Sequence, residues 1–147
     1  MRIWAGSDHA GLNLKDKLVA WLREQGHEVE DVGTHDHDST DYPDYAERVA
    51  RAVADKKADW GLLVCGTGQG MAMTANRIPG VRAAVVADTF SARSTRAHND
   101  ANVLAIGERV VGLGLAEEIV KAFMTTPFEG GRHVRRVAKM TALEEKG

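Results

Sequence analysis

The stretch WGLLVCGTGQG, residues 60–70, decides the fold class, because a short apolar run passes directly into a glycine-rich turn. Residues 60–64 have the continuous apolar character of a strand that is buried on both faces of a sheet. The glycines allow a sharp change of direction, and the pattern predicts a helix over residues 68–76. A buried strand that leads through a turn into a helix is the repeating unit of a parallel α/β sheet.

The same alternation of short β-rich runs and longer helical stretches continues on both sides of this unit. The expected strands cover residues 2–7, 28–32, 60–64, 81–86 and 103–106. The expected helices cover residues 11–25, 42–54, 68–76, 89–99, 113–124 and 133–145, and the last of them has no strand behind it. The pattern predicts a three-layer, doubly wound, Rossmann-like α/β fold with a five-stranded parallel sheet and a C-terminal helix.

Apolar side chains recur at helical spacing in two of these helices and are expected in the core. They are Leu14, Leu18, Leu22, Leu115, Ile119 and Phe123.

Composition limits the class of protein. The 147 residues are 44% hydrophobic and 27% charged, which fits one domain over residues 1–147. The formal net charge of -2 lacks the basic excess of a nucleic-acid binder. No apolar run is long enough to cross a bilayer, and the N-terminus has no signal-peptide pattern. Because the single cysteine forms no internal disulfide, we expect a soluble cytoplasmic protein without nucleic-acid or membrane partners.

Polar motifs follow three of the expected strands. Asp8 and His9 follow the first strand, the Cys65 turn follows the third, and Asp88 follows the fourth. In doubly wound sheets, ligands bind beyond the carboxyl ends of the strands. We therefore expect a ligand site at this edge of the sheet.

The spacing of the glycine turn excludes three common phosphate-binding motifs. A P-loop requires a lysine after the glycines, and a dinucleotide fingerprint requires glycine or alanine at the position of Met71. A phosphatase of the C-x5-R type requires arginine at that same position. The glycine turn is therefore none of these three motifs.

Cys65 lies where a strand gives way to a helix, and the pKa of a thiol tends to fall at such a position. A thiolate can act as a base, and the backbone N–H groups of the turn can stabilise an oxyanion. Removal of a proton beside a sugar carbonyl needs both features. The alternative is that Cys65 is a small buried hydrophobic residue at the end of a core strand.

Five blocks of the sequence resemble the motifs of type B ribose-5-phosphate isomerases, in the same order and over nearly the whole chain. They are residues 6–11 (GSDHAG), 40–46 (TDYPDYA), 65–68 (CGTG), 98–104 (HNDANVL) and 129–133 (EGGRH).

The resemblance implies interconversion of ribose 5-phosphate and ribulose 5-phosphate through a cis-enediol, without a metal or an organic cofactor. It makes Cys65 the base and His98 the acid that opens the furanose ring, with Thr67 and Asp8 as ring-opening and hydroxyl-binding partners. It also implies an active site shared between the two subunits of a homodimer, and some members form tetramers. The remaining substrate-binding positions are Tyr42, Gly66, Gly68, Gln69, Gly70 and Asn99 for the sugar, and His9, Arg109, Arg132 and Arg136 for the phosphate.

Several alternatives stay open from the sequence. The substrate could be another phosphorylated aldose, such as a tetrose 4-phosphate, allose 6-phosphate or galactose 6-phosphate, and the domain could bind a sugar phosphate without turning it over. His98 could simply cap its helix. The histidine- and aspartate-rich loop of residues 35–41 could bind a metal, although an exposed polar loop of this kind is more often solvated surface.

Overall fold

The computed structural model describes residues 1–145 and contains one parallel sheet of five strands in the order β2-β1-β3-β5-β4. All four strand pairings are parallel. The predicted fold class is therefore confirmed. The strands are β1 (Arg2–Ser7), β2 (Glu28–Asp31), β3 (Trp60–Cys65), β4 (Ala83–Val85) and β5 (Val103–Gly107).

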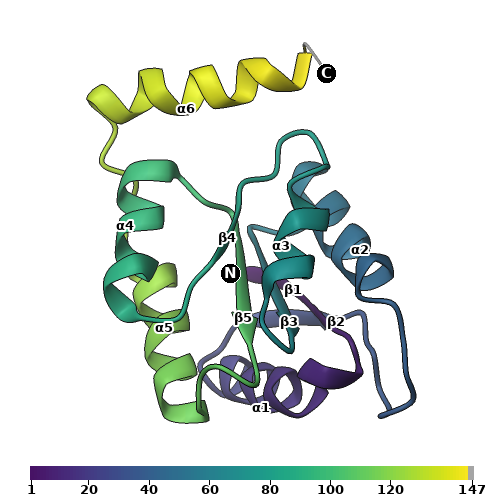
Figure 1. Cartoon of the computed structure of the whole chain (residues 1–147). Helices are drawn as coiled ribbons and strands as arrows, with labels where there is room; N and C mark the ends of the chain where they lie inside the picture. Colours follow the sequence, from purple (N-terminus) through teal and green to yellow (C-terminus); the bar gives the residue numbers. More distant parts are fainter. Residues whose placement is uncertain (146–147) are drawn as a thin grey trace.

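Helices cover both faces of the sheet: α1, α4 and α5 lie on one face, and α2 and α3 lie on the other (Figure 1). Two short 3-10 turns, His9–Gly11 and Leu143–Glu145, complete the regular structure. The α-helices are α1 (Leu12–Glu24), α2 (Tyr42–Ala54), α3 (Gln69–Ala75), α4 (Thr89–Asn99), α5 (Leu113–Thr125) and α6 (Arg132–Ala142).

The central strand β3 separates two apolar cores. Successive side chains of a strand point to opposite faces, so Leu62 and Val64 join the core beneath α1 and α5. Leu63 and Cys65 join the core beneath α2 and α3. All six residues of β3 are buried, which explains its continuous apolar run.

Two expectations differ in detail from the structure. Strand β4 covers three residues rather than six because it is an edge strand, and the Arg82 N–H before it donates to the Asn102 side chain at 2.8 Å instead of to a neighbouring strand. The expectation that Leu115 is a core residue is wrong, since it is 43% exposed. The buried face of α5 passes through Ala116, Ile119 and Phe123, and Leu115 lies beside this face.

Lys15 is a buried cation that links α1 to the end of β2. Its side chain has 0% exposure, and Nζ lies 2.8 Å from both carboxylate oxygens of Asp31. Nζ also donates to the Thr34 carbonyl at 2.9 Å and contacts the exposed Asp16 carboxylate at 2.9 Å. The ammonium group is therefore fully paired in the fold.

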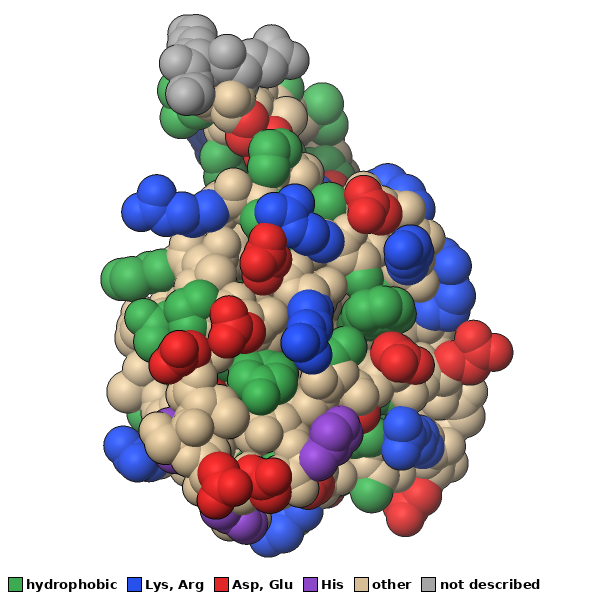
Figure 2. Space-filling view, turned by 90° about the vertical axis from the view of Figure 1, so that its right-hand side faces the viewer, with side chains coloured by type: hydrophobic (Ala, Val, Ile, Leu, Met, Phe, Trp, Pro, Cys, Tyr) green, Lys and Arg blue, Asp and Glu red, His purple; other side chains and the backbone are tan. Residues whose placement is uncertain are grey.

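Helix α6 stands apart from the body of the domain in both whole-molecule views (Figure 1; Figure 2). His133 is its buried residue, whereas Val134, Met140 and Leu143 are exposed. The helix thus presents apolar side chains that the described part of this chain does not cover.

On the face seen in Figure 2, acidic and basic side chains are interspersed, so neither sign dominates that surface. Within residues 1–145, none of the helices combines the length and apolar character that crossing a membrane requires.

Candidate functional site

The strand order creates a crevice between β1 and β3, because the chain leaves these neighbouring strands in opposite directions along the sheet. Such a switch point is where doubly wound folds bind ligands, beyond the carboxyl ends of the strands. A cavity of about 310 Å³ opens there. It is lined by Asp8, His9, Ala10, Tyr42, Cys65, Gly66, Thr67, Gly70 and Arg109.

Cys65 ends β3 and borders this cavity, although only 6% of the residue is exposed. Its Sγ accepts a hydrogen bond from the Gly68 N–H at 3.1 Å. Gly68 makes this bond with φ of +81°, a conformation that glycine adopts without strain. Helix α3 has seven residues rather than the nine expected, and the Gly68 N–H before it is the backbone donor directed at the sulfur.

Two glycines of the turn leave room for neighbouring side chains. The Tyr42 ring lies against Gly70 so closely that a Cβ at this position would overlap the ring. The Arg109 guanidinium lies over Gly66, where a Cβ would come within 3.5 Å of Nη1. The missing side chain at Gly70 thus admits the Tyr42 ring to the cavity, and the Arg109 guanidinium lies in ordinary contact distance of Gly66.

The Asp8 carboxylate is fixed by the backbone behind β1. Its Oδ1 accepts hydrogen bonds from the Ala10 and Gly11 N–H groups at 3.0 and 3.1 Å, and the residue is 7% exposed. Oδ2 makes no hydrogen bond to the described residues, so this oxygen remains available to a ligand in the cavity that Asp8 borders.

His9 is oriented by a single backbone contact. The Thr40 N–H donates to His9 Nδ1 at 3.2 Å. A ring nitrogen that accepts a hydrogen bond carries no proton, so the proton of the neutral ring lies on Nε2. His9 Nε2–H is therefore a donor for an anionic ligand.

The other two residues of the turn complete its shape. Thr67 is exposed, and its Oγ1 accepts a hydrogen bond from the Gln69 N–H at 3.3 Å. Gly107 at the end of β5 lies against the Thr67 backbone, where a Cβ would come within 2.7 Å of Thr67 Cα. This close packing holds the turn against β5.

His98 belongs to a second polar cluster with Glu129 and His133. The two imidazole rings are stacked, with centroids 4.4 Å apart and planes 13° from parallel. Glu129 Oε1 lies 3.6 Å from His98 Nε2, and Oε2 lies 4.0 Å from His133 Nε2. Desolvation lowers the pKa of His133 below the ordinary 6.5, and the nearby His98 and Arg132 lower it further.

This cluster has the donor atoms of a cation site, since one ligand atom from each residue lies within 4.8 Å of the others. The near-parallel stack places the two ring planes side by side, so the nitrogen lone pairs do not converge on one ion. The arrangement suits a stacked pair of rings better than a metal centre. The histidines of the other candidate metal loop, His35 and His37, are exposed.

The site residues that the sequence predicts fall into two groups, which lie at opposite ends of the strands. Cys65 pairs with Gly107 at the carboxyl end of β5, whereas His98 and Asn99 precede the amino end of that strand. The cavity beside Cys65 is lined by neither His98, Asn99, Arg132 nor Arg136. Asp88, expected at the ligand edge, does not line it either. It accepts hydrogen bonds from the Ser91 N–H and Oγ at 2.6 and 2.9 Å and so caps α4.

Sequence reasoning left two members of the second cluster without a role. Glu129 and His133 stand in a recognised sequence block, but only Arg132 of that block was assigned a function. The spacing of four residues between them was the available signal, because it brings two side chains to neighbouring positions around a helix start.

Comparison with known proteins connects these features to a family. The family described as Ribose/Galactose Isomerase matches residues 3–140. Ribose-5-phosphate isomerase B of Escherichia coli (strain K12) is 50% identical over 145 residues, which are 99% of this chain and 97% of that protein.

Solved structures of this family are similar to the chain over nearly its whole length. Ribose-5-phosphate isomerase B of Clostridium thermocellum superposes with a TM-score of 0.98 at 50% identity, covering 99% of both chains. The Mycoplasma genitalium ribose-5-phosphate isomerase B with bound ribulose-5-phosphate gives 0.95 at 39% identity, covering 99% of this chain and 97% of that one. A match over nearly the whole length, with the cysteine turn at the switch point of the sheet, places this chain in the ribose/galactose isomerase family, among the type B ribose-5-phosphate isomerases.

Proposed function

We propose that this protein interconverts D-ribose 5-phosphate and D-ribulose 5-phosphate, with Cys65 as the base. The observation that carries the proposal is the position of Cys65, which borders the switch-point cavity and whose Sγ accepts a hydrogen bond from a backbone N–H. Several similar proteins are ribose-5-phosphate isomerases B, and the structure of one of them contains ribulose-5-phosphate.

In the proposed reaction, the Cys65 thiolate removes the proton from C2 of the open-chain aldose and returns it to C1. The electron pair of the broken C–H bond forms the enediolate, and its oxyanion is stabilised by N–H groups of the turn from Gly66 to Gly70. A second proton passes from the oxygen on C2 to the oxygen on C1, which converts the enediolate into the ketose when C1 is protonated. The chemistry is balanced without an external oxidant or reductant, because one carbon is oxidised while its neighbour is reduced. Asp8 and Thr67 hold the sugar hydroxyls beside the thiol.

The phosphate would be held by cations on two different elements. His9 and Arg109 border the Cys65 cavity and supply an N–H donor and a guanidinium. Arg132 and Arg136 are one helical turn apart at the start of α6, so their side chains share one side of the helix. Arg132 and Arg136 do not line this cavity. In the proposed arrangement, a second copy of the chain supplies these two arginines, and they form a phosphate clamp together with His9 and Arg109.

We propose a homodimer in which the partner's His98, Asn99, Arg132 and Arg136 complete each Cys65 cavity, and in which the partner's His98 opens the furanose ring. A groove of about 1060 Å³ between α3, β4, α4 and the end of α6 supports this assembly. It is lined in part by Met73, Pro79, Met140 and Leu143, and it lies along the edge strand β4. A second copy is the occupant that supplies the missing half of the site. The family resemblance also admits a tetramer built from two such dimers.

A complementation experiment tests the shared site. Cys65→Ala and His98→Ala chains are each expected to be inactive, and mixing them after mild unfolding and refolding should restore about a quarter of the wild-type activity, because half of the dimers then contain one intact site. Refolded mixtures of each variant with itself are the control. A mixture that stays as inactive as its parents would show that each site is built within one chain.

Arg136→Ala is expected to raise KM for the sugar phosphate about tenfold or more while kcat stays near the wild-type value. A phosphate contact that is equally strong in ground and transition states contributes uniform binding. Steady-state kinetics with ribose 5-phosphate provide the measurement, and Arg135→Ala, on a different side of α6, is the matched control. An unchanged KM would remove Arg136 from the clamp.

A panel of sugar phosphates tests the substrate. We expect the highest kcat/KM for ribose 5-phosphate, above tetrose 4-phosphate, allose 6-phosphate and galactose 6-phosphate. A higher value for a six-carbon aldose would transfer the proposal to that substrate.

In deuterated water, label should enter the product beside the carbonyl, and absence of label with tight binding would indicate a domain that only binds sugar phosphates. We place the enzyme in the cytoplasm, where the single free thiol of Cys65 stays reduced.

A further inference from the structure

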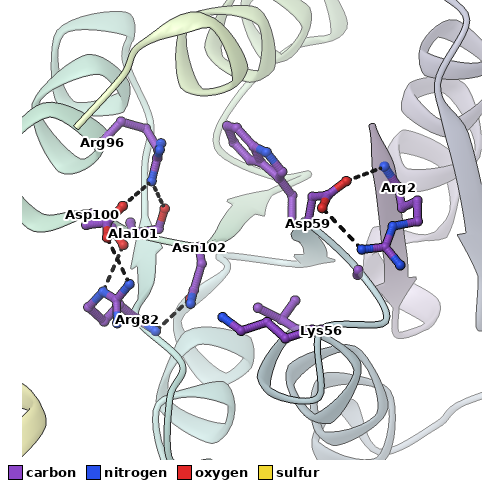
Figure 3. A pocket seen from close by; sticks show the side chains of 11 residues that line it. Arg2, Lys56, Asp59, Arg82, Arg96, Asp100, Ala101 and Asn102 are labelled. Carbon is purple, nitrogen blue, oxygen red and sulfur yellow. Dashed lines mark hydrogen bonds and ion pairs between the residues drawn. The ribbon is translucent and has the colours of Figure 1, made fainter.

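A second polar cavity lies at the amino ends of strands β1, β3 and β5, whereas Cys65 lies at the carboxyl ends of the strands. Its volume is about 280 Å³. Figure 3 shows its charged side chains arranged around one hollow, with contributions from strand starts and from the turns that follow α2 and α4. These are the cations Arg2, Lys56, Arg82 and Arg96 and the carboxylates Asp59 and Asp100.

The ion pairs in this cavity leave an excess of positive charge. Asp59 pairs with Arg2 at 3.4 Å. Asp100 is shared by two guanidiniums, those of Arg82 at 3.3 Å and Arg96 at 3.0 Å, so one carboxylate faces two cations. Within residues 1–145, no carboxylate lies in ion-pair distance of Lys56 Nζ. The cavity is therefore cationic as a whole.

The guanidinium groups of Arg82 and Arg96, which both pair with Asp100, are held in place before any ligand binds. Arg82 Nε donates to the Asp100 carbonyl at 2.8 Å, and Arg96 Nη1 donates to the Ala101 carbonyl at 2.6 Å. The Arg96 guanidinium also lies 5.2 Å from the centroid of the Trp60 ring. Arg96 Nε is buried without a hydrogen-bond partner. Side chains fixed in this way lose little conformational entropy on binding an anion.

The backbone carries a second, independent sign. Lys56 and Asp100 are the non-glycine residues with positive φ in the described part of the chain, with φ of 63° and 49°, and both line this cavity. Each lies just beyond the end of a helix, α2 or α4, where glycine is the usual residue for this conformation. Strained backbone of this kind clusters at binding sites, where the side chain is needed.

We propose that this cavity is an anion site that binds a phosphate group, either as free phosphate or as a compact phosphate monoester. A doubly charged anion matches the excess of cationic donors, and guanidinium and ammonium groups are the usual ligands of phosphate. The volume admits a small ligand and no larger cofactor. The isomerase chemistry uses none of these side chains, and the Cys65 cavity lies at the other end of the strands.

The test is a titration of the intact protein with inorganic phosphate, followed in ¹H–¹⁵N correlation spectra. The amides of Lys56, Ala58 and Asn102 should shift and saturate with a Kd of about 1 mM, separately from any shift of the amides of residues 66–70 at the catalytic cavity. A parallel titration with methyl phosphate identifies the preferred source of the group by its lower Kd. Shifts that rise linearly, or that chloride at matched ionic strength reproduces, would overturn the proposal.

Two neighbouring lysines provide a matched pair of variants. Lys56→Gly removes the cation and the strained side chain together, so phosphate affinity should fall about fivefold while Tm rises by about 2 °C. Lys57→Ala removes an adjacent exposed lysine that does not line this cavity, and its phosphate affinity should equal that of the wild type. Unchanged affinity in Lys56→Gly, or an equal loss in Lys57→Ala, would contradict the assignment.

Discussion

Replacement of Cys65 by alanine is expected to lower kcat about 10²- to 10⁴-fold or more, the range that a proton-transferring base contributes. The thiol is the one nucleophilic or basic group that ends β3, and it borders the cavity while Gly68 N–H points at its sulfur. The fold should persist, because alanine fills most of the volume of this small side chain and the turn is held by its backbone. The measurement is steady-state turnover of ribose 5-phosphate beside a circular dichroism melt.

Cys65→Ser is the matched control for this loss. A serine hydroxyl keeps the size and the hydrogen bond of the thiol, but it ionises far less readily, so its turnover should also be reduced by orders of magnitude. Binding of ribulose 5-phosphate should change little in both variants, since the phosphate clamp is intact. Near wild-type turnover in either variant would remove Cys65 from the reaction and leave a carboxylate such as Asp8 as the base to examine.

Replacement of Asp31 by alanine should be the most destabilising of the substitutions considered, by about 3–5 kcal/mol. The change leaves the fully buried Lys15 ammonium without its main counterion, and only the Thr34 carbonyl and the exposed Asp16 remain as partners. The Gly33 N–H also loses its acceptor, Asp31 Oδ1, at 2.9 Å. The measurement is urea unfolding at pH 7, read as the change in the free energy of unfolding.

The double variant Lys15→Met with Asp31→Ala separates a buried charge from a lost contact. Methionine has a similar length and no charge, so the double variant should recover much of the stability lost in Asp31→Ala. Asp55→Ala, at an exposed position after α2, is a control that should stay within about 0.5 kcal/mol of the wild type. If Asp31→Ala unfolds within about 1 kcal/mol of the wild type, Lys15 does not depend on this partner.

The sequence was sufficient for the fold because the central strands β3 and β5 are buried along their whole length and have continuous apolar runs. The run of β3 and the glycine turn behind it lie in the structure within a residue or two of their predicted positions. The local pattern is misleading where the environment of a residue departs from it. Leu115 has the spacing of a core residue but lies beside the buried face of α5, and Lys15 is fully buried although its charge is typical of a solvated helix surface.

The sequence predicted that Asp8, His9 and Cys65 lie together, but not how all of the candidate site residues are arranged. Asp8, His9 and Cys65 meet because each follows a parallel strand, which the strand pattern implies. His98 ends the helix that precedes β5, so the order of the elements already implies that it lies at the amino ends of the strands, away from Cys65. Arg136 lies on a helix that follows no strand, and no local pattern states where such a helix comes to rest.

If His98 and Arg136 serve the Cys65 cavity as proposed, their separation from it means that a single chain cannot complete a site. The five residues of β5 span about 17 Å of hydrogen-bonded sheet between the two edges, and no side-chain rotation or loop movement closes such a gap. In the proposed homodimer, a chain that is defective in both halves of the site would disable both sites that it shares with a healthy copy, so a minority of such chains in a cell would depress turnover beyond their own share.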